Sequence, residues 1–86
     1  MEEKKVYLVL EEFNDDGEIE SGVLGVFDTK EKAYNKLEEQ IEVYKSYDLF
    51  DTEDFDEAEK DENSFSIYKD CDDYYGKIWI VEQIVQ

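Results

Sequence analysis

Residues 5–27 read "KVYLVLEEFNDDGEIESGVLGVF". Two apolar runs flank an Asp-Gly dipeptide at 16–17, and this dipeptide is a strong hairpin signal because glycine permits the positive φ that tight turns need. The stretch therefore predicts an antiparallel β-hairpin. A two-residue turn at 16–17 gives these expected cross-strand pairs: Leu10 with Val23, Tyr7 with Val26, and Val6 with Phe27.

The first strand of this hairpin is apolar on both of its faces. Val6, Leu8 and Leu10 alternate with Tyr7 and Val9. A hairpin with one solvated face should alternate more cleanly between apolar and polar residues. The second face is therefore expected to meet further strands, a helix or another subunit. We expect the protein to self-associate as a homodimer, through a sheet face or the edge of the terminal strand.

Residues 27–47, "FDTKEKAYNKLEEQIEVYKSY", predict the principal helix. Asp28 and Glu31 have the spacing of a capping box, and Thr29 is the alternative N-cap. Lysines and glutamates fill most of the remaining positions, as expected for a helix that packs one face on a core. The apolar stripe has helical spacing and consists of Tyr34, Leu37, Ile41 and Tyr44.

The remaining chain contains an acidic stretch followed by two further predicted strands. The first strand is "SFSIYKD" at 64–70, and "KIWIVEQIVQ" at 77–86 ends the chain as a strongly apolar strand. The expected fold is α+β, with a four-stranded, mainly antiparallel sheet in the order β-β-α-acidic segment-β-β and one principal helix. We expect a single domain over residues 1–86, with an acidic helix or loop at 48–63.

The charge balance excludes several classes of function. The chain has 26 acids against 9 basic residues, a net charge of −17, and every base is lysine. Direct binding to nucleic acid or to anionic membranes is therefore disfavoured. The sequence has no histidine and one cysteine, Cys71, which excludes the usual zinc sites and an internal disulfide. With no signal peptide indicated, we expect the cytoplasm of a bacterium or of an infected host cell.

No pattern of residues predicts catalysis, a cofactor or a dedicated metal site. Two carboxylates work as a general acid and a general base when different environments within a cleft shift their pKa values apart. The acids of this chain lie in runs that are expected to be exposed, where no such difference arises. Asp51, Glu53 and Glu62 have the spacing of positions 1, 3 and 12 of an EF-hand loop, but Phe55 and Asp56 occupy positions 5 and 6. We therefore expect a protein that is not an enzyme.

Residues 48–62, "DLFDTEDFDEAEKDE", contain nine carboxylates and one lysine. If residues 52–60 form a short helix, Asp51 or Thr52 caps it, and Phe55 and Ala58 give it a narrow apolar contact. Taken as helical throughout, the run carries one acid per roughly 2.5 Å, against about 1.7 Å per charge along B-DNA. The run predicts either a solvated face that keeps the protein soluble or a surface that mimics phosphates.

Three acidic patches are the candidate partner-binding sites. Tyr74 and Tyr75, together with Phe50 and Phe55, are expected to add apolar contacts to them. The candidate residues are Asp48, Asp51, Glu53, Asp54, Asp56, Glu57 and Glu59 in the acidic run, Asp15, Asp16 and Glu18 at the hairpin tip, and Asp70, Asp72, Asp73, Tyr74 and Tyr75 before the last strand.

In size, in charge and in its acidic runs at 11–20 and 48–73, the chain resembles the small acidic phage-encoded inhibitors of host nucleic-acid enzymes. This class includes DNA-mimic anti-restriction proteins, uracil-DNA glycosylase inhibitors and several anti-CRISPR proteins. The resemblance implies a basic nucleic-acid-binding partner, a nuclease or a CRISPR effector, and a role in evading host defence. The alternatives are an immunity or antitoxin protein that masks a nuclease toxin, and an acidic homodimeric adaptor. Separately, "GVFDTKEKAYNKLEEQI" is similar to small phage and bacterial domains and supports only the fold.

Overall fold

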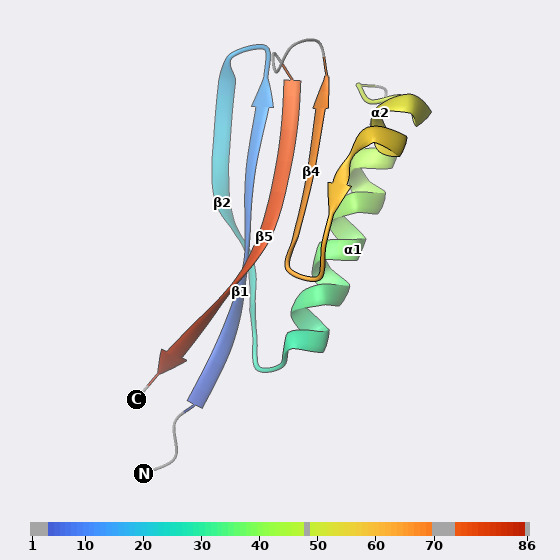
Figure 1. Cartoon of the computed structure of the whole chain (residues 1–86). Coiled ribbons are helices and arrows are strands. Elements are labelled where there is room, and N and C mark those ends of the chain that lie inside the picture. The colour runs from blue at the N-terminus through green and yellow to red at the C-terminus, as the bar shows by residue number, and fades with distance from the viewer. Residues whose placement is uncertain (1–3, 48, 70–73, 86) are drawn as a thin grey trace.

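In the computed structural model, which describes residues 4–47, 49–69 and 74–85, the first two strands form the predicted hairpin. β1 runs over Lys4–Asp15 and β2 over Glu18–Phe27 (Figure 1). Asp16 and Gly17 have φ values of 51° and 93°, as a type I′ turn requires. The Asn14 side chain fixes the turn, because its Oδ1 accepts a hydrogen bond from the Gly17 backbone N–H at 2.8 Å.

The register of the hairpin shifts by one residue halfway along. Leu10 lies opposite Val23, which confirms the first predicted pair. The other two predicted pairs were wrong, because Phe27 lies opposite Tyr7, and Val26 lies opposite Leu8. The cause is an irregularity of the β-bulge type between Val9 and Leu10, where β2 contains one residue more than β1.

The extra residue at this shift is Leu24, and it changes which side chains of β2 meet the core. Leu24 and Phe27 both pack against the core cluster. Val23 and Val26 lie more than half exposed on the other face of the sheet. In a regular strand, two residues that are an odd number of positions apart point to opposite faces of the sheet. Leu24 and Phe27 share a face, and so do Val23 and Val26, only because the bulge interrupts the alternation between them.

The sheet has five antiparallel strands in the order β2-β1-β5-β4-β3, so the prediction of four strands was wrong. The additional strand is very short and lies inside the predicted acidic segment, where it forms the sheet edge beside β4. β1 and β5, the first and last strands of the chain, pair along their whole described length at the centre of the sheet. The remaining bounds are Glu59–Lys60 for β3, Ser64–Lys69 for β4 and Tyr74–Val85 for β5.

The principal helix, α1, runs over Lys30–Ser46 and covers one face of the sheet. Thr29 is its N-cap and accepts a hydrogen bond from the Lys32 backbone N–H at 3.2 Å. Asp28, the other candidate cap, forms an ion pair with the Lys32 side chain instead. The buried apolar core between helix and sheet consists of Val9, Ala33, Leu37, Ile41, Tyr44, Phe50, Phe65, Ile67 and Ile78.

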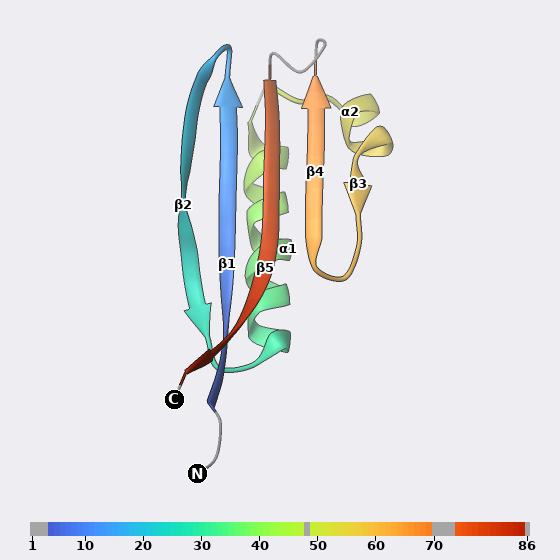
Figure 2. The ribbon, with the colours of Figure 1, turned by 60° about the vertical axis from the view of Figure 1, so that its left-hand side comes forward.

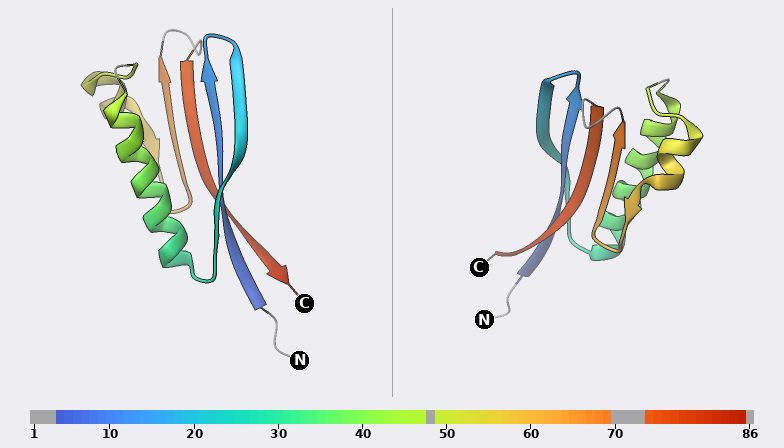
Figure 3. Two further views of the ribbon diagram at one scale, coloured as in Figure 1. Left: turned by 180° about the vertical axis from the view of Figure 1, so that it is seen from behind. Right: turned by 45° about the horizontal axis from the view of Figure 1, so that its top comes forward.

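The second helix, α2, spans Thr52–Glu57 and lies beside the C-terminal end of α1. It is shorter than the helix considered for residues 52–60. Figures 2 and 3 show both helices on the same side of the sheet, so the opposite face is not covered by any described element. No helix within the described residues is long and apolar enough to span a membrane.

Candidate functional site

The topology of the sheet brings the hairpin tip to the same end of the molecule as the start of β5. Asp15, the last residue of β1, lies opposite both Glu18 of β2 and Tyr74 of β5. The C-terminal end of α1 and all of α2 lie toward this end too (Figure 1). Acids that are more than thirty residues apart in the chain are therefore gathered at one end of the fold. We call residues 15–20 together with residues 51–57 the acidic end.

At the acidic end, α2 is a short helix whose first turn is held by two of its own acids. The Asp51 side chain accepts a hydrogen bond from the Asp54 backbone N–H, and the Asp54 side chain accepts one from the Asp51 backbone N–H, each at 3.0 Å. This reciprocal pair is a capping box. Asp51 and Asp54 are therefore structural, and the other acids of α2, all exposed, are Glu53, Asp56 and Glu57.

The ring of Phe55 anchors α2 to the core. Phe55 makes an edge-to-face contact with Phe50, with 6.1 Å between the ring centroids. Phe50 itself is 5% exposed and belongs to the buried core. The expectation that Phe50 contacts a partner was therefore wrong. Its contact with Phe55 holds α2 beside β4, with the exposed acids of the helix directed outward.

No acid of the acidic end forms an ion pair with lysine within the described part of the chain, although Lys45 Nζ lies 6.0 Å from the ring centroid of Phe55 in α2. Lys45, on the last turn of α1, pairs with Glu42, and Lys69 donates a hydrogen bond to the Leu49 carbonyl at 2.6 Å. The negative charge of this end is thus left for solvent or for a partner. The ion pairs among the described residues are Lys5–Glu82, Lys32–Asp28, Lys36–Glu39, Lys45–Glu42 and Lys60–Glu38.

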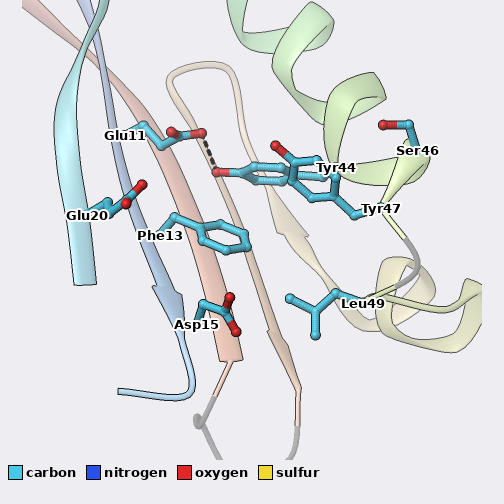
Figure 4. A pocket seen from close by; sticks show the side chains of 8 residues that line it. All are labelled: Glu11, Phe13, Asp15, Glu20, Tyr44, Ser46, Tyr47 and Leu49. Carbon is cyan, nitrogen blue, oxygen red and sulfur yellow. Dashed lines mark hydrogen bonds between the residues drawn. The ribbon is translucent and has the colours of Figure 1, made fainter. Parts of the chain in front are cut away.

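A cleft of about 580 Å³ opens between the hairpin and the C-terminal end of α1 (Figure 4). Carboxylates from the strands stand on one side of it, and aromatic and aliphatic side chains from α1 and the segment after it stand on the other. The cleft is lined by Glu11, Phe13, Asp15, Glu20, Tyr44, Ser46, Tyr47 and Leu49.

Glu11 is the innermost acid of this cleft and is held by two hydrogen bonds. Its Oε2 accepts one from the Tyr44 hydroxyl at 2.6 Å and one from Gln40 Nε2 at 2.7 Å. Burial, with the Glu11 bond as the second cause, raises the pKa of the Tyr44 phenol above its ordinary value. Tyr44 therefore keeps its proton and serves as a donor that orients the carboxylate.

The lining of the cleft suits a cation that carries apolar surface, such as a lysine or arginine side chain of a partner. Asp15 and Glu20 are exposed at the rim, and Glu11 lies deeper. The rings of Phe13 and Tyr47 are edge-to-face, with centroids 6.0 Å apart, and offer aromatic surface to the stem of such a side chain. No group of three or more acids in the described ranges is arranged to hold a metal ion.

The cleft could have been found from the position of Glu11 in the sequence. Glu11 falls at an inward position of β1, in line with Val9 and Phe13, where an apolar residue is expected. A carboxylate at such a position needs a hydrogen-bond donor, because an unpaired buried charge is costly. Tyr44 was assigned to the core by its spacing, and the sequence carries no signal that its hydroxyl is the donor.

The two predicted tyrosines of β5 lie on opposite faces of the sheet. Tyr74 packs against the core cluster on the helix side. Tyr75 lies on the uncovered side, where its hydroxyl donates to Glu12 Oε2 at 2.8 Å and its ring centroid is 5.1 Å from Lys77 Nζ. The predicted patch before the last strand is thus not one surface. Its acids Asp70, Asp72 and Asp73, and Asp48 of the acidic run, lie outside the described residues.

Comparison with known proteins gives one family and no function. The profile of DUF7336, a domain of unknown function, matches residues 4–70 of the 86-residue chain. No curated protein and no solved structure has a significant match. The matched region ends before β5, although β5 lies at the centre of the sheet.

Proposed function

The chain belongs to DUF7336, a family of unknown function, and we propose that it is a non-enzymatic inhibitor that places its acidic end in a basic nucleic-acid-binding groove. The class of target, a nuclease or CRISPR effector of a host defence system, follows from the resemblance in size and charge. The observation that carries the proposal is the gathering, at one end of the fold, of exposed acids that form no ion pair with lysine within the described residues.

The density of charge supports phosphate mimicry. α2 is about 9 Å long at 1.5 Å per residue and carries four acids, which is one charge per roughly 2.3 Å of axis. B-DNA carries one per about 1.7 Å. A groove that binds phosphates would therefore release counterions to a similar degree on binding this helix. The four acids of α2 are Glu53, Asp54, Asp56 and Glu57.

The cleft beside the hairpin supplies a contact that a phosphate backbone lacks. A basic groove presents lysine and arginine side chains, whose stems are apolar and whose heads are cationic. One such side chain can lie against the ring of Phe13 and reach the carboxylates of Glu11 and Glu20. The proposed interface thus combines exposed charges on α2 with one enclosed cationic side chain.

The test is affinity capture from a bacterial lysate at low salt, with the wild-type chain and two charge-matched variants as baits. The first variant is Glu53→Gln/Asp56→Asn/Glu57→Gln, which spares the capping acids. The control is Glu31→Gln/Glu39→Gln/Glu42→Gln, three exposed acids of α1. Exposed pairs contribute about 0.2–1 kcal/mol each, so the α2 variant, which loses three, should lose roughly 3- to 150-fold in affinity for a captured enzyme and the control much less.

Two further readouts separate mimicry from an ordinary interface. Binding should fall along a straight line in a plot of log affinity against log salt concentration, and a DNA or RNA oligonucleotide should compete with the bait. If both triple variants capture the same enzyme equally well, or if nucleic acid binds alongside the bait, the acidic end is not the binding surface.

A further inference from the structure

The face of the sheet that lies opposite α1 is apolar and exposed. Figure 2 looks onto this face, with α1 behind the strands and α2 at the edge of the sheet, beyond β4. Val23 is 56% exposed, Val26 is 59% exposed and Val81 is 37% exposed, although all three lie in regular strands. We call this surface the open sheet face. Its apolar part consists of Leu8, Leu10, Val23, Val26, Trp79 and Val81.

The register of the strands arranges this apolar part in two adjacent rows. Leu8 lies between Val26 and Val81, and the next residue of β1 on the same face, Leu10, lies between Val23 and Trp79. Toward the hairpin tip the next row is polar. It contains Ser21, Glu12, Lys77, Ser66 and Glu59 in strand order. An apolar centre beside a polar margin is the usual composition of a protein–protein interface.

The open sheet face carries little net charge, in contrast to the rest of the protein. In these rows two acids, Glu12 and Glu59, are accompanied by one base, Lys77, which leaves a net charge of −1, while the chain as a whole carries −17. Lys77 Nζ also lies 5.7 Å from the ring centroid of Tyr68 and 5.1 Å from that of Tyr75. A basic partner of the kind proposed for the acidic end would gain little charge attraction here.

The size of the face is compatible with a weak, specific dimer. β2, β1, β5 and β4 span about 19 Å at a spacing of about 4.8 Å, and the residues from Leu8 to Asn14 span about 20 Å along β1. The flat projection is therefore roughly 400 Å² per copy, or about 800 Å² for two copies. Side chains standing out of the sheet raise the accessible area toward the lower limit for specific interfaces, about 1,200 Å² in total.

We propose that the open sheet face binds the same face of a second copy of this chain, in a two-fold dimer of stacked sheets. Two copies joined here bring little net charge together, and apolar rows meet apolar rows. Both α1 helices remain outside, and the acidic ends stay free. The proposal does not rest on the function proposed for the acidic end, because it uses the other face of the molecule.

Sedimentation velocity of the full chain tests this proposal with two variants of equal net charge. Val26→Lys/Val81→Lys changes the net charge from −17 to −15 and introduces charge into the open sheet face. Glu39→Lys makes the same change of net charge on the exposed side of α1. Near-UV circular dichroism of each variant checks that the fold is retained, and Trp79, the sole tryptophan, reports on the face by its fluorescence emission.

At protein concentrations of tens of micromolar, the wild type and Glu39→Lys should sediment with twice the 10.3 kDa chain mass. An interface of this size is expected to have a dissociation constant of about this order. Because a two-fold interface contains each position twice, the double lysine variant should raise the dissociation constant by more than about a hundredfold. Dilution of the wild type should shift Trp79 emission to longer wavelength. Added salt should strengthen the dimer by screening the −17 charges.

Three results would overturn the proposal. The first is a monomer mass for the wild type at about 100 µM together with Trp79 emission that does not depend on concentration. The second is a dimer that persists in a folded Val26→Lys/Val81→Lys variant, which would place the interface elsewhere. The third is an equal loss of dimer in Glu39→Lys, which would make net charge, and not the open sheet face, the determinant.

Discussion

Replacing Gly76 with alanine should destabilise the fold, because the ring of Tyr44 occupies the space that the new methyl group needs. Gly76 is buried in β5, between Phe13 of β1 and Ile67 of β4. A Cβ atom at this position would lie 2.6 Å from Cε2 and 2.9 Å from Cζ of Tyr44. Both distances are well inside van der Waals contact, so the ring or the strand must move.

The surroundings of Tyr44 prevent an easy displacement of the ring. Its centroid lies 5.6 Å from that of Phe13, 6.2 Å from that of Phe50 and 6.4 Å from that of Phe65, and its hydroxyl is bonded to Glu11. Overpacking of such a core costs about 1–3 kcal/mol. Alanine also lowers the conformational entropy of the unfolded chain, which stabilises the folded state by about 0.4–1 kcal/mol. The net expected loss is about 1–2 kcal/mol.

Urea denaturation at one fixed protein concentration measures this loss, and Gly22→Ala is the matched control. Gly22 lies in β2 with no atom within 4 Å of an added Cβ, so its replacement should be neutral or slightly stabilising. In thermal unfolding, the Gly76→Ala deficit corresponds to a fall in Tm of roughly 4–16 °C. In a Tyr44→Leu background the added methyl group has room, so the cost of Gly76→Ala should nearly vanish.

Two results would refute this reasoning. One is a Gly76→Ala variant that unfolds at the same urea concentration as Gly22→Ala. The other is a double-mutant cycle in which Gly76→Ala costs as much in the Tyr44→Leu background as it does in the wild type. Either result would mean that the contact between the Tyr44 ring and β5 does not limit the packing of the core.

Two further predictions concern side chains near the acidic end. Tyr44→Phe should lower the free energy of unfolding by about 1–2 kcal/mol, because the hydrogen bond to Glu11 is lost. Burial raises the pKa of Tyr44 above its ordinary value of 10.0. The protonated Tyr44 phenol therefore contributes its full stabilisation below about pH 10, and this contribution is lost as the pH rises further. Absorbance at 295 nm should show one phenol that ionises only on unfolding in the wild type and none in the variant, and early ionisation of all tyrosines would contradict this. Asp51→Ala should remove the N-cap of α2 at a cost of about 1 kcal/mol and speed amide exchange in residues 52–57, whereas Asp56→Ala, at an exposed non-capping position, should leave this exchange unchanged. Equal exchange in the two variants would show that the capping box does not hold the helix.

The main elements of the fold were predictable because each has a local signal. The Asp-Gly turn and the helical spacing of the stripe of α1 depend on neighbours in the sequence, and both were confirmed. Asp28 and Thr29 could not be separated in advance, since either side chain can cap a helix. The structure selects Thr29 because Asp28 is engaged with Lys32.

The features that sequence reasoning missed depend on contacts between distant segments. The bulge at Leu24 lies in the run "VLGV", where apolar residues on both faces conceal the extra residue. β3 has two residues and exists only through pairing with Ser66 and Phe65. Phe50 precedes an acidic helix and was assigned to a surface, but the rings of Phe13, Tyr44 and Phe55 surround it in the core. No local pattern reports such contacts.

The gathering of acids at one end of the fold follows from strand order and could be anticipated only in part. An antiparallel hairpin places its turn beside the start of a neighbouring strand, but the sequence does not say that β5 is that neighbour. The position of α2 depends on the direction in which α1 crosses the sheet. The charge of each segment was therefore readable in advance, and their common location was not.

The pairing of β1 with β5 has a consequence for how the chain folds. These strands form the centre of the sheet, and their contacts join residues up to Lys4 and Val85, close to the longest separation that the chain allows. During synthesis, β1 keeps one edge without a partner until residues 74–85 leave the ribosome, because β2 occupies only the other edge. The hairpin and α1 can form early, but the core closes only when Ile78 arrives. A search over such a long loop slows folding, so the sheet is completed late, only after β5 has paired with β1.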